Sequence, residues 1–126
     1  LMGFALSQRL VVMKDYQAAY IYITLDDQKK FNIQKGDTEG LVNYALSIAN
    51  IKLAAMFTES KDMVKISFRS VGSFSVNEFA RNHFSGGGHA NAAGGKSEEN
   101  LQDTIERFKS LVIENKEEIK NKDEII

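Results

Sequence analysis

Runs of apolar residues predict several strands in the first half of the chain. Residues 18–25 are apolar on both faces and rich in Tyr and Ile, which is typical of a central strand. Residues 51–58 and 63–69 show two further strand patterns on either side of the polar turn 59–62. These two segments are therefore predicted to pair as a hairpin.

Apolar residues at helical spacing predict four helices. The third has the clearest start, because Ser75 at the N-cap and Glu78 three residues later form a capping box. Gly86 is placed to terminate this helix, since glycine readily adopts the left-handed conformation found at helix ends. Residues 26–35 are interpreted as a polar connection. The predicted helices are residues 1–13, residues 37–49 with Asp37 as the N-cap, residues 75–85, and a last helix capped by Ser97.

The alternation of these elements predicts an α/β fold, a single domain with a mixed β-sheet of about four or five strands flanked by helices. The domain is expected to cover residues 17–113. The chain opens on Leu1, so residues 1–16 are expected to be a linker helix that enters from a missing N-terminal part. Residues 114–126 are mostly charged and are expected to form a solvated tail.

Composition and charge exclude several classes of function. The 126 residues contain no Cys, which excludes thiolate metal sites and fits a cytoplasmic location. A net charge of −1 argues against a protein that coats long nucleic acid, whereas a ligand with a few phosphates remains compatible with it. No apolar run approaches the length that crosses a bilayer, so no membrane partner is expected.

The most unusual segment is the glycine-rich run at residues 84–95, which contains Gly86, Gly87, Gly88 and His89. Consecutive glycines can form a concave nest of backbone N–H groups that accepts an anion, and a histidine adds a side-chain donor. A flexible linker is the structural alternative, but linkers usually continue into polar residues. Here apolar residues flank the glycines, so the pattern favours a loop that binds a phosphate or a nucleotide.

Arg69 is the second candidate, at the end of a predicted strand and on its polar face. A guanidinium offers a planar fork that matches phosphate oxygens, although an isolated arginine at a strand end is more often a surface charge. The succession of strand, loop, capped helix and glycine-rich loop would bring Arg69 and His89 to one cleft. Ser70 and Asn91 are secondary candidates, and His83, on the helical stripe, is expected to have a structural role.

Other kinds of site find no support in the sequence. Two His residues without any Cys, and a glycine run without a carboxylate, do not predict a metal site. The glycine run lacks the Gly-Lys-Ser/Thr ending of a phosphate-binding P-loop. No local signature supports a Ser-His-Asp catalytic arrangement.

Three segments together resemble a known family: residues 65–70 with Arg69 and Ser70, residues 76–80, and the glycine-rich run. They are similar to the C-terminal substrate-binding domain of the Asp-His-His (DHH) phosphoesterases, and the helix that begins at Asp37 also resembles that domain. The resemblance covers about residues 1–113, and the Gly-Gly-Gly-His element is its most specific part. Within that family the chain looks like the bacterial oligoribonucleases that also dephosphorylate 3′-phosphoadenosine-5′-phosphate (PAP).

The resemblance implies a division of labour between two domains. A missing N-terminal DHH catalytic domain would carry two Mn²⁺ ions, whereas this chain would hold no cofactor and have no activity by itself. Its partners would be that domain and a short oligonucleotide or mononucleotide, and a homodimer is compatible with the family. Arg69, Gly86, Gly87, Gly88 and His89 would bind the nucleotide phosphate.

Two other functions remain open at this point. Alanyl-tRNA synthetases carry a related domain that helps to bind tRNA, which predicts a more basic surface than a net charge of −1 provides. A stand-alone nucleotide-sensing module would bind its ligand without a neighbouring catalytic domain.

Overall fold

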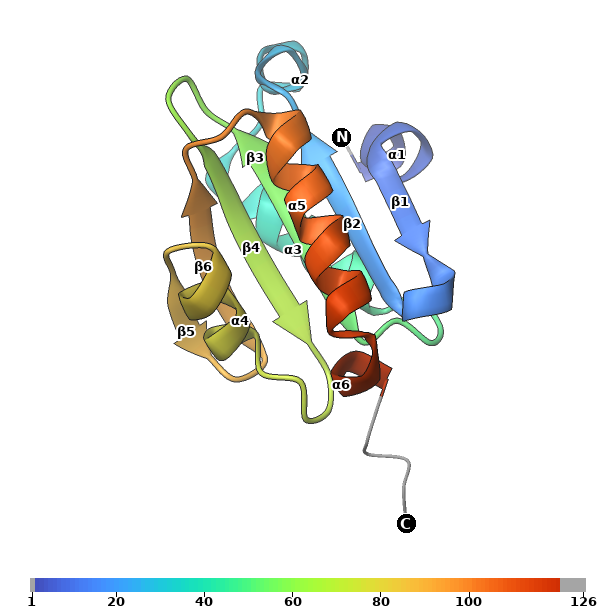
Figure 1. Ribbon diagram of the computed structural model, residues 1–126. Coiled ribbons are helices and arrows are strands. Elements are labelled where there is room, and N and C mark those ends of the chain that lie inside the picture. Colours follow the sequence, from blue (N-terminus) through green and yellow to red (C-terminus); the bar gives the residue numbers. More distant parts are fainter. Residues whose placement is uncertain (1, 121–126) are drawn as a thin grey trace.

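The computed structural model describes residues 2–120, which form one mixed sheet with helices on both faces (Figure 1). The strand order is β1-β2-β3-β4-β6-β5; β2 and β3 are parallel, and every other neighbouring pair is antiparallel. The predicted α/β class is confirmed, with six strands where about four or five were expected. The strands are β1 (Leu10–Met13), β2 (Ala18–Ile23), β3 (Leu53–Glu59), β4 (Val64–Ser70), β5 (Gly87–His89) and β6 (Ala92–Ser97).

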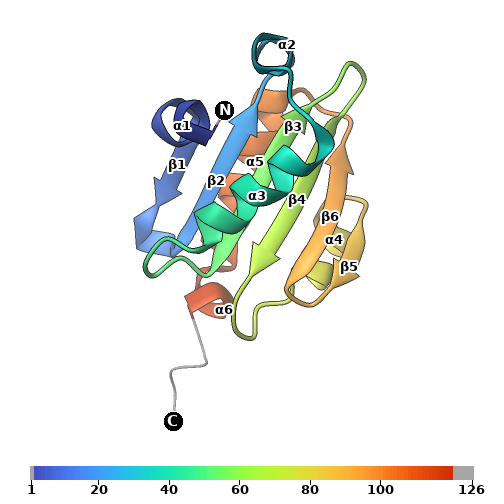
Figure 2. The same cartoon turned by 180° about the vertical axis from the view of Figure 1, so that it is seen from behind.

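The helices cover the two faces unequally. Helix α3 packs against β2, β3 and β4 on one face, where Figure 2 shows no helix in front of β6 and β5. Helices α4 and α5 lie on the opposite face. The helices are α1 (Met2–Phe4), α2 (Leu25–Phe31), α3 (Lys35–Leu46), α4 (Val76–His83), α5 (Leu101–Glu114) and α6 (Lys116–Lys120), with a π-helical turn at Ala5–Arg9 and a 3-10 turn at Lys14–Tyr16.

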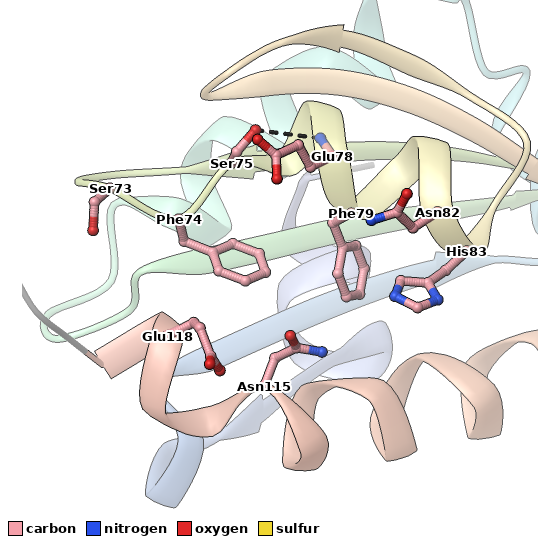
Figure 3. Close-up of a pocket in the computed structure, with 9 residues that line it drawn as sticks. All are labelled: Ser73, Phe74, Ser75, Glu78, Phe79, Asn82, His83, Asn115 and Glu118. Carbon is pink, nitrogen blue, oxygen red and sulfur yellow. Dashed lines mark hydrogen bonds between the residues drawn. The ribbon is translucent and has the colours of Figure 1, made fainter.

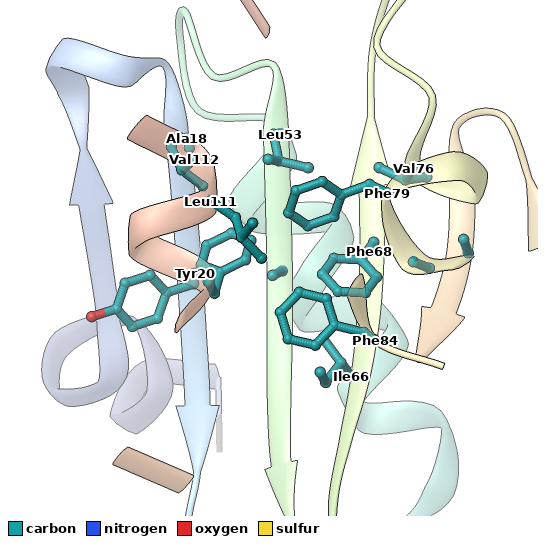
Figure 4. Packing of buried hydrophobic residues seen from close by; sticks show 14 of the residues in the cluster. Ala18, Tyr20, Leu53, Ile66, Phe68, Val76, Phe79, Phe84, Leu111 and Val112 are labelled. Atoms are coloured by element: carbon teal, nitrogen blue, oxygen red, sulfur yellow. The ribbon is translucent and has the colours of Figure 1, made fainter. Parts of the chain in front are cut away.

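Aromatic rings fill the core between the sheet and α5 (Figure 4). Phe57, Phe68, Phe84 and Phe108 are fully enclosed, and the ring centroids of Phe57 and Phe108 lie 5.3 Å apart in an edge-to-face arrangement. Edge-to-face packing aligns the positive ring edge with the negative face of its neighbour. A second, smaller cluster joins α3 to the other face and consists mainly of aliphatic residues.

The expected helix over residues 1–13 is only partly correct. Helical turns end at Arg9, and Leu10–Met13 forms β1, which pairs antiparallel with β2 in the register Leu10↔Ile21. Four consecutive apolar residues suit a strand as well as a helical stripe, and the open edge of β2 decides between them. Residues 10–13 therefore belong to the sheet and do not form a linker helix.

Residues 26–35, expected as a polar connection, contain most of α2. Thr24 caps this helix, because its hydroxyl accepts from the Asp27 amide at 3.1 Å and the Asp27 carboxylate accepts from the Thr24 amide at 3.1 Å. The same carboxylate accepts two hydrogen bonds from Arg9, at 2.8 and 3.0 Å. These bonds from Arg9 hold the pKa of Asp27 below its ordinary value and offset the cost of burying it. A helix too polar to show an apolar stripe is thus fixed by its cap and one ion pair.

The first residues of α3 and α5 differ from those expected from the sequence. Helix α3 begins after Gln34, and Asp37 occupies the third position of its capping box instead of the N-cap. Asn100, not Ser97, caps α5, since its side chain accepts from the Asp103 amide at 2.7 Å. The capping box at Ser75 is confirmed in part by the hydrogen bond from the Glu78 amide to the Ser75 hydroxyl.

The charged segment after residue 113 is not entirely solvated. Helix α5 continues to Glu114, and α6 returns the chain to the domain so that Ile119 is only 2% exposed. One apolar side chain among charged ones is enough to dock a single helical turn. The rest of the expected tail, residues 121–126, lies outside the described residues.

Candidate functional site

The structure places Arg69 and His89 in one lateral row of the sheet. Arg69 of β4 pairs with Ala92 of β6, and Ala92 pairs with His89 of β5. Directly paired residues of neighbouring strands project to the same face, and two strand spacings separate the outer Cα atoms by about 10 Å. Only the methyl group of Ala92 therefore separates the two side chains along this row.

The Arg69 side chain is partly enclosed and held from two directions. It is 19% exposed, and its Nη1 donates to the Phe68 carbonyl at 2.9 Å. Its Nη2 lies 4.0 Å from the Glu39 carboxylate of α3, which is 72% exposed. A long ion pair with a solvated carboxylate is weak, so a phosphate could displace Glu39 from this guanidinium.

Part of the glycine run forms an edge strand where a loop was expected. Gly87–His89 is β5 and pairs antiparallel with β6. The Gly86 amide donates to the Ala80 carbonyl at 3.1 Å, and the Gly88 amide donates to Asn77 Oδ1 at 2.9 Å. Two of the three glycine amides thus have partners inside the domain, and they do not form an open nest for an anion.

Close packing of main chain explains why glycine is needed here. A Cβ added to Gly86 would lie 1.9 Å from the Gly94 carbonyl oxygen, and one added to Gly88 would lie 2.8 Å from the Ala92 oxygen. Gly86 is also not the left-handed residue after α4, since Ser85 takes that conformation with φ of 51°. The glycines therefore allow β5, β6 and the end of α4 to approach one another.

Ser70 and Asn91, the secondary candidates, connect structural elements. The Ser70 hydroxyl donates to the Phe74 carbonyl at 2.8 Å and accepts from the Asn91 side-chain amide at 2.9 Å. The Asn91 amide also donates to the Gly72 carbonyl at 3.2 Å. Ser70 is 3% exposed, and its hydroxyl joins the loop after β4 to the β5–β6 turn.

The uncovered part of the sheet, on the side of α3, forms a surface that we call the open face. Its members alternate along three strands, and a shallow hollow of about 530 Å³ lies over the end that is distant from Arg69. From the sequence, only the Arg69 end was a candidate, although the alternation along residues 65–69 was the signal for the rest. The open face consists of Lys65, Ser67 and Arg69 of β4, Ala92, Gly94 and Lys96 of β6, and Gly87 and His89 of β5.

A separate cleft of about 300 Å³ lies between α4 and the α5–α6 junction, on the other side of the sheet (Figure 3). His83 reaches this cleft, and its ring packs on Phe79 with centroids 5.4 Å apart. The expected structural role of His83 agrees with this packing. Glu78 and Glu118 also border the cleft, which makes it unlike the open face in charge.

The part of the chain that the structure describes contains neither a group of metal ligands nor a membrane-spanning helix. No three His, Asp or Glu side chains within residues 2–120 are grouped so that they could hold a metal ion. Over the same residues, no helix is both long and apolar enough to cross a bilayer.

Proteins of known sequence or structure share this domain. The chain is 32% identical over 84 residues to the bifunctional oligoribonuclease and PAP phosphatase NrnA of Bacillus subtilis, covering 67% of this chain and 26% of that protein. An exopolyphosphatase-related protein from Bacteroides fragilis superimposes with a TM-score of 0.86 and 42% identity over 91% of this chain and 34% of its own. The chain thus spans about a quarter to a third of the length of these two relatives.

More distant structures share the fold alone. The pGpG-specific phosphodiesterase PggH of Vibrio cholerae has a TM-score of 0.62 at 16% identity, over 90% of this chain and 37% of that one. The C-Ala domain of Aquifex aeolicus alanyl-tRNA synthetase has a TM-score of 0.56 at 11% identity, over 75% of this chain and 89% of that one. The DHHA1 domain model matches residues 15–115, and the chain therefore belongs to the DHHA1 family, the domain that accompanies DHH phosphoesterase domains.

Proposed function

We propose that this chain is the substrate-binding domain of a DHH-family phosphoesterase that hydrolyses short oligonucleotides or PAP. The observation that carries the proposal is the lateral row Arg69–Ala92–His89, which places a guanidinium and an imidazole on the same face of the sheet. The relationship to NrnA, an oligoribonuclease and PAP phosphatase, supports the class of substrate.

Arg69 is the principal phosphate-binding group in this proposal. Its guanidinium stays charged at every working pH and can offer two parallel N–H donors to two phosphate oxygens. The bond to the Phe68 carbonyl orients the guanidinium before a ligand arrives, which reduces the conformational entropy lost on binding. Glu39 is displaced as the phosphate enters.

In this proposal His89 has a complementary role at the other end of the row Arg69–Ala92–His89. Its side chain is exposed, at the end of β5, where the hairpin turn to β6 begins. An imidazole can donate a hydrogen bond to a phosphate oxygen in either protonation state. Gly86, Gly87 and Gly88 contribute indirectly, because their close packing fixes the strand that carries His89.

Hydrolysis itself belongs to a second domain in this proposal. Two Mn²⁺ ions held there would supply an activated water and stabilise the leaving oxygen. The role of this chain would be to bind and orient the substrate. Its open face would lie toward that domain.

Calorimetric titration of the 126-residue chain with PAP and with a 5′-phosphorylated diadenylate tests the proposal. Arg69→Ala is expected to weaken binding by about ten- to a hundred-fold, the usual effect of losing a charged hydrogen bond. Arg69→Lys should restore part of the affinity, since it keeps the charge and loses the fork. His89→Gln should lose less than His89→Ala, because it keeps a donor.

Arg107→Ala is the matched control. Arg107 lies on α5, on the far face, where it pairs with Glu99 at 3.4 Å and stacks over Phe84 at 4.5 Å. Its removal changes the net charge equally and should leave affinity unchanged. Equal affinities of wild type and Arg69→Ala for both ligands would refute the proposal, and tighter binding of a hairpin RNA would favour the tRNA-binding alternative.

A further inference from the structure

Two lysines face each other at the far end of the open face. Lys65 of β4 pairs in register with Lys96 of β6, and both side chains are exposed. Like charges directly opposite one another on a sheet are destabilising. Within residues 2–120, no ion pair joins either ammonium to a carboxylate. The pair therefore concentrates positive charge at one point without an internal counter-ion.

The surface beside this pair is hollow and made largely of main chain. The hollow of about 530 Å³ is lined by both lysines, by Ser67, by Gly94 and Gly95 of β6, by Gly87 of β5 and by Gly86 just before β5. A second hollow of about 270 Å³ shares Lys65 and Ser67 and adds Thr58 and Gln34. A ligand could thus approach the ammonium groups closely and reach hydroxyl and amide groups at the same time.

The distance to Arg69 matches a repeating anionic ligand. Successive residues on one face of β4 are Lys65, Ser67 and Arg69, so the lysine pair lies about 13 Å from the row of Arg69 and His89. An extended single strand of nucleic acid covers this distance in about two internucleotide steps. The middle position is bordered by Ser67, Gly94 and Gly87, which leave room for the connecting sugar and base.

We propose that Lys65 and Lys96 form a second phosphate position, occupied only by substrates with at least three phosphates in a row. This inference rests on the proposed function and deepens it by naming single-stranded oligonucleotides of three or more nucleotides as the ligands that use the whole open face. PAP and dinucleotides bind at the Arg69 end alone. The domain thereby distinguishes substrates by length.

The test compares ligands of different length on the 126-residue chain. Fluorescence anisotropy competition, with a labelled pentanucleotide as probe, gives affinities for PAP and for 5′-phosphorylated oligoadenylates of two, three and five nucleotides. The variants are the double substitution Lys65→Gln with Lys96→Gln, and Lys109→Gln on α5 as the control for a lost surface lysine. Circular dichroism checks that each variant keeps its fold.

The double variant is expected to weaken binding of the three- and five-nucleotide ligands by about ten-fold and to reduce the slope of log affinity against log salt concentration by about 0.7. Affinities for PAP and the dinucleotide should stay within about two-fold of wild type. Lys109→Gln should behave as wild type with every ligand.

Two outcomes overturn the inference. Equal weakening for all four ligands would show a general electrostatic effect, and unchanged affinity for the pentanucleotide would show that the lysines contact no phosphate. In both cases the Arg69→Ala result still decides the proposed function separately. Failure of the wild-type chain to bind any of the ligands would remove both proposals.

Discussion

Asn91 holds Ser70 by two hydrogen bonds that run in opposite directions. The Asn91 side-chain amide donates to the Ser70 hydroxyl at 2.9 Å, and the Ser70 main-chain amide donates to the Asn91 carbonyl at 3.0 Å. Ser70 follows Arg69 in the chain, and Asn91 lies in the turn after His89. This contact fixes the β5–β6 turn against the end of β4.

Loss of the hydrogen bonds between Ser70 and Asn91 should lower both the stability of the domain and its affinity for PAP. Ser70→Ala leaves the Phe74 carbonyl and the Asn91 amide without a buried partner, so we expect the free energy of unfolding to fall by about 1–3 kcal/mol. Urea denaturation measures this loss, with Ser7→Ala, an exposed serine, as the control. PAP affinity should fall too if the contact between Ser70 and Asn91 fixes the position of His89. An unchanged affinity would show that this contact stabilises the fold without positioning His89.

Glycine substitutions should divide into two classes. Gly86→Ala places a methyl group 1.9 Å from the Gly94 oxygen, and main chain on both sides prevents relief, so the domain should be strongly destabilised. Gly40→Ala, inside α3, meets nothing within 4 Å and should raise stability by up to about 1 kcal/mol through helix propensity. Thermal denaturation of both variants provides the comparison. Wild-type stability of Gly86→Ala would contradict the close approach of the two strands.

The carboxylate of Glu39 should compete with a phosphate for Arg69. Glu39→Gln removes the competing charge, and we expect affinity for PAP to rise by about two- to five-fold, the scale of a weak surface ion pair. Glu106→Gln on α5 makes the same change of charge on the opposite face and should have little effect. Calorimetry with all three proteins distinguishes a local effect from a change in net charge.

Acid should release the stabilisation that Asp27 provides. Because its pKa is lowered in the folded protein, Asp27 binds a proton more readily when the chain is unfolded, so acidification favours unfolding. The contribution is complete above the ordinary value of 3.8 and disappears as pH falls through the lowered pKa. The difference in unfolding free energy between wild type and Asp27→Asn should be about 1–3 kcal/mol at neutral pH and shrink in acid. A difference independent of pH would exclude the ion pair with Arg9 as its cause.

Elements with a strong apolar pattern or a distinct cap were predictable from sequence. The hairpin of β3 and β4 follows from alternation, and α4 follows from its capping residue Ser75. Strands β5 and β6 were not predictable in this way. Their residues are mostly Gly and Ala, which show no alternation. Only pairing makes them strands, since β6 pairs with β4 and β5 pairs with β6.

The candidate site was predictable in part for the same reason. Residue type identified Arg69 and His89, and only the register of three strands shows that they share a row. The role of the glycines could not be read from composition, because an open nest and a close contact of main chains both require residues without a side chain. Asn77, whose Oδ1 accepts a hydrogen bond from the Gly88 amide, gave no sequence signal beyond its place on α4.

The absence of bulk in the middle of the open face has a consequence for specificity. Ala92 and Gly94 have no side-chain group that forms hydrogen bonds with base edges, so Ser67 is the one side chain of the middle row that could do so. In the proposed function the charged side chains around them bind phosphates. A surface of this kind would contact the sugar-phosphate backbone of a bound strand and would not distinguish its bases. The domain should therefore accept strands of any base sequence with similar affinity.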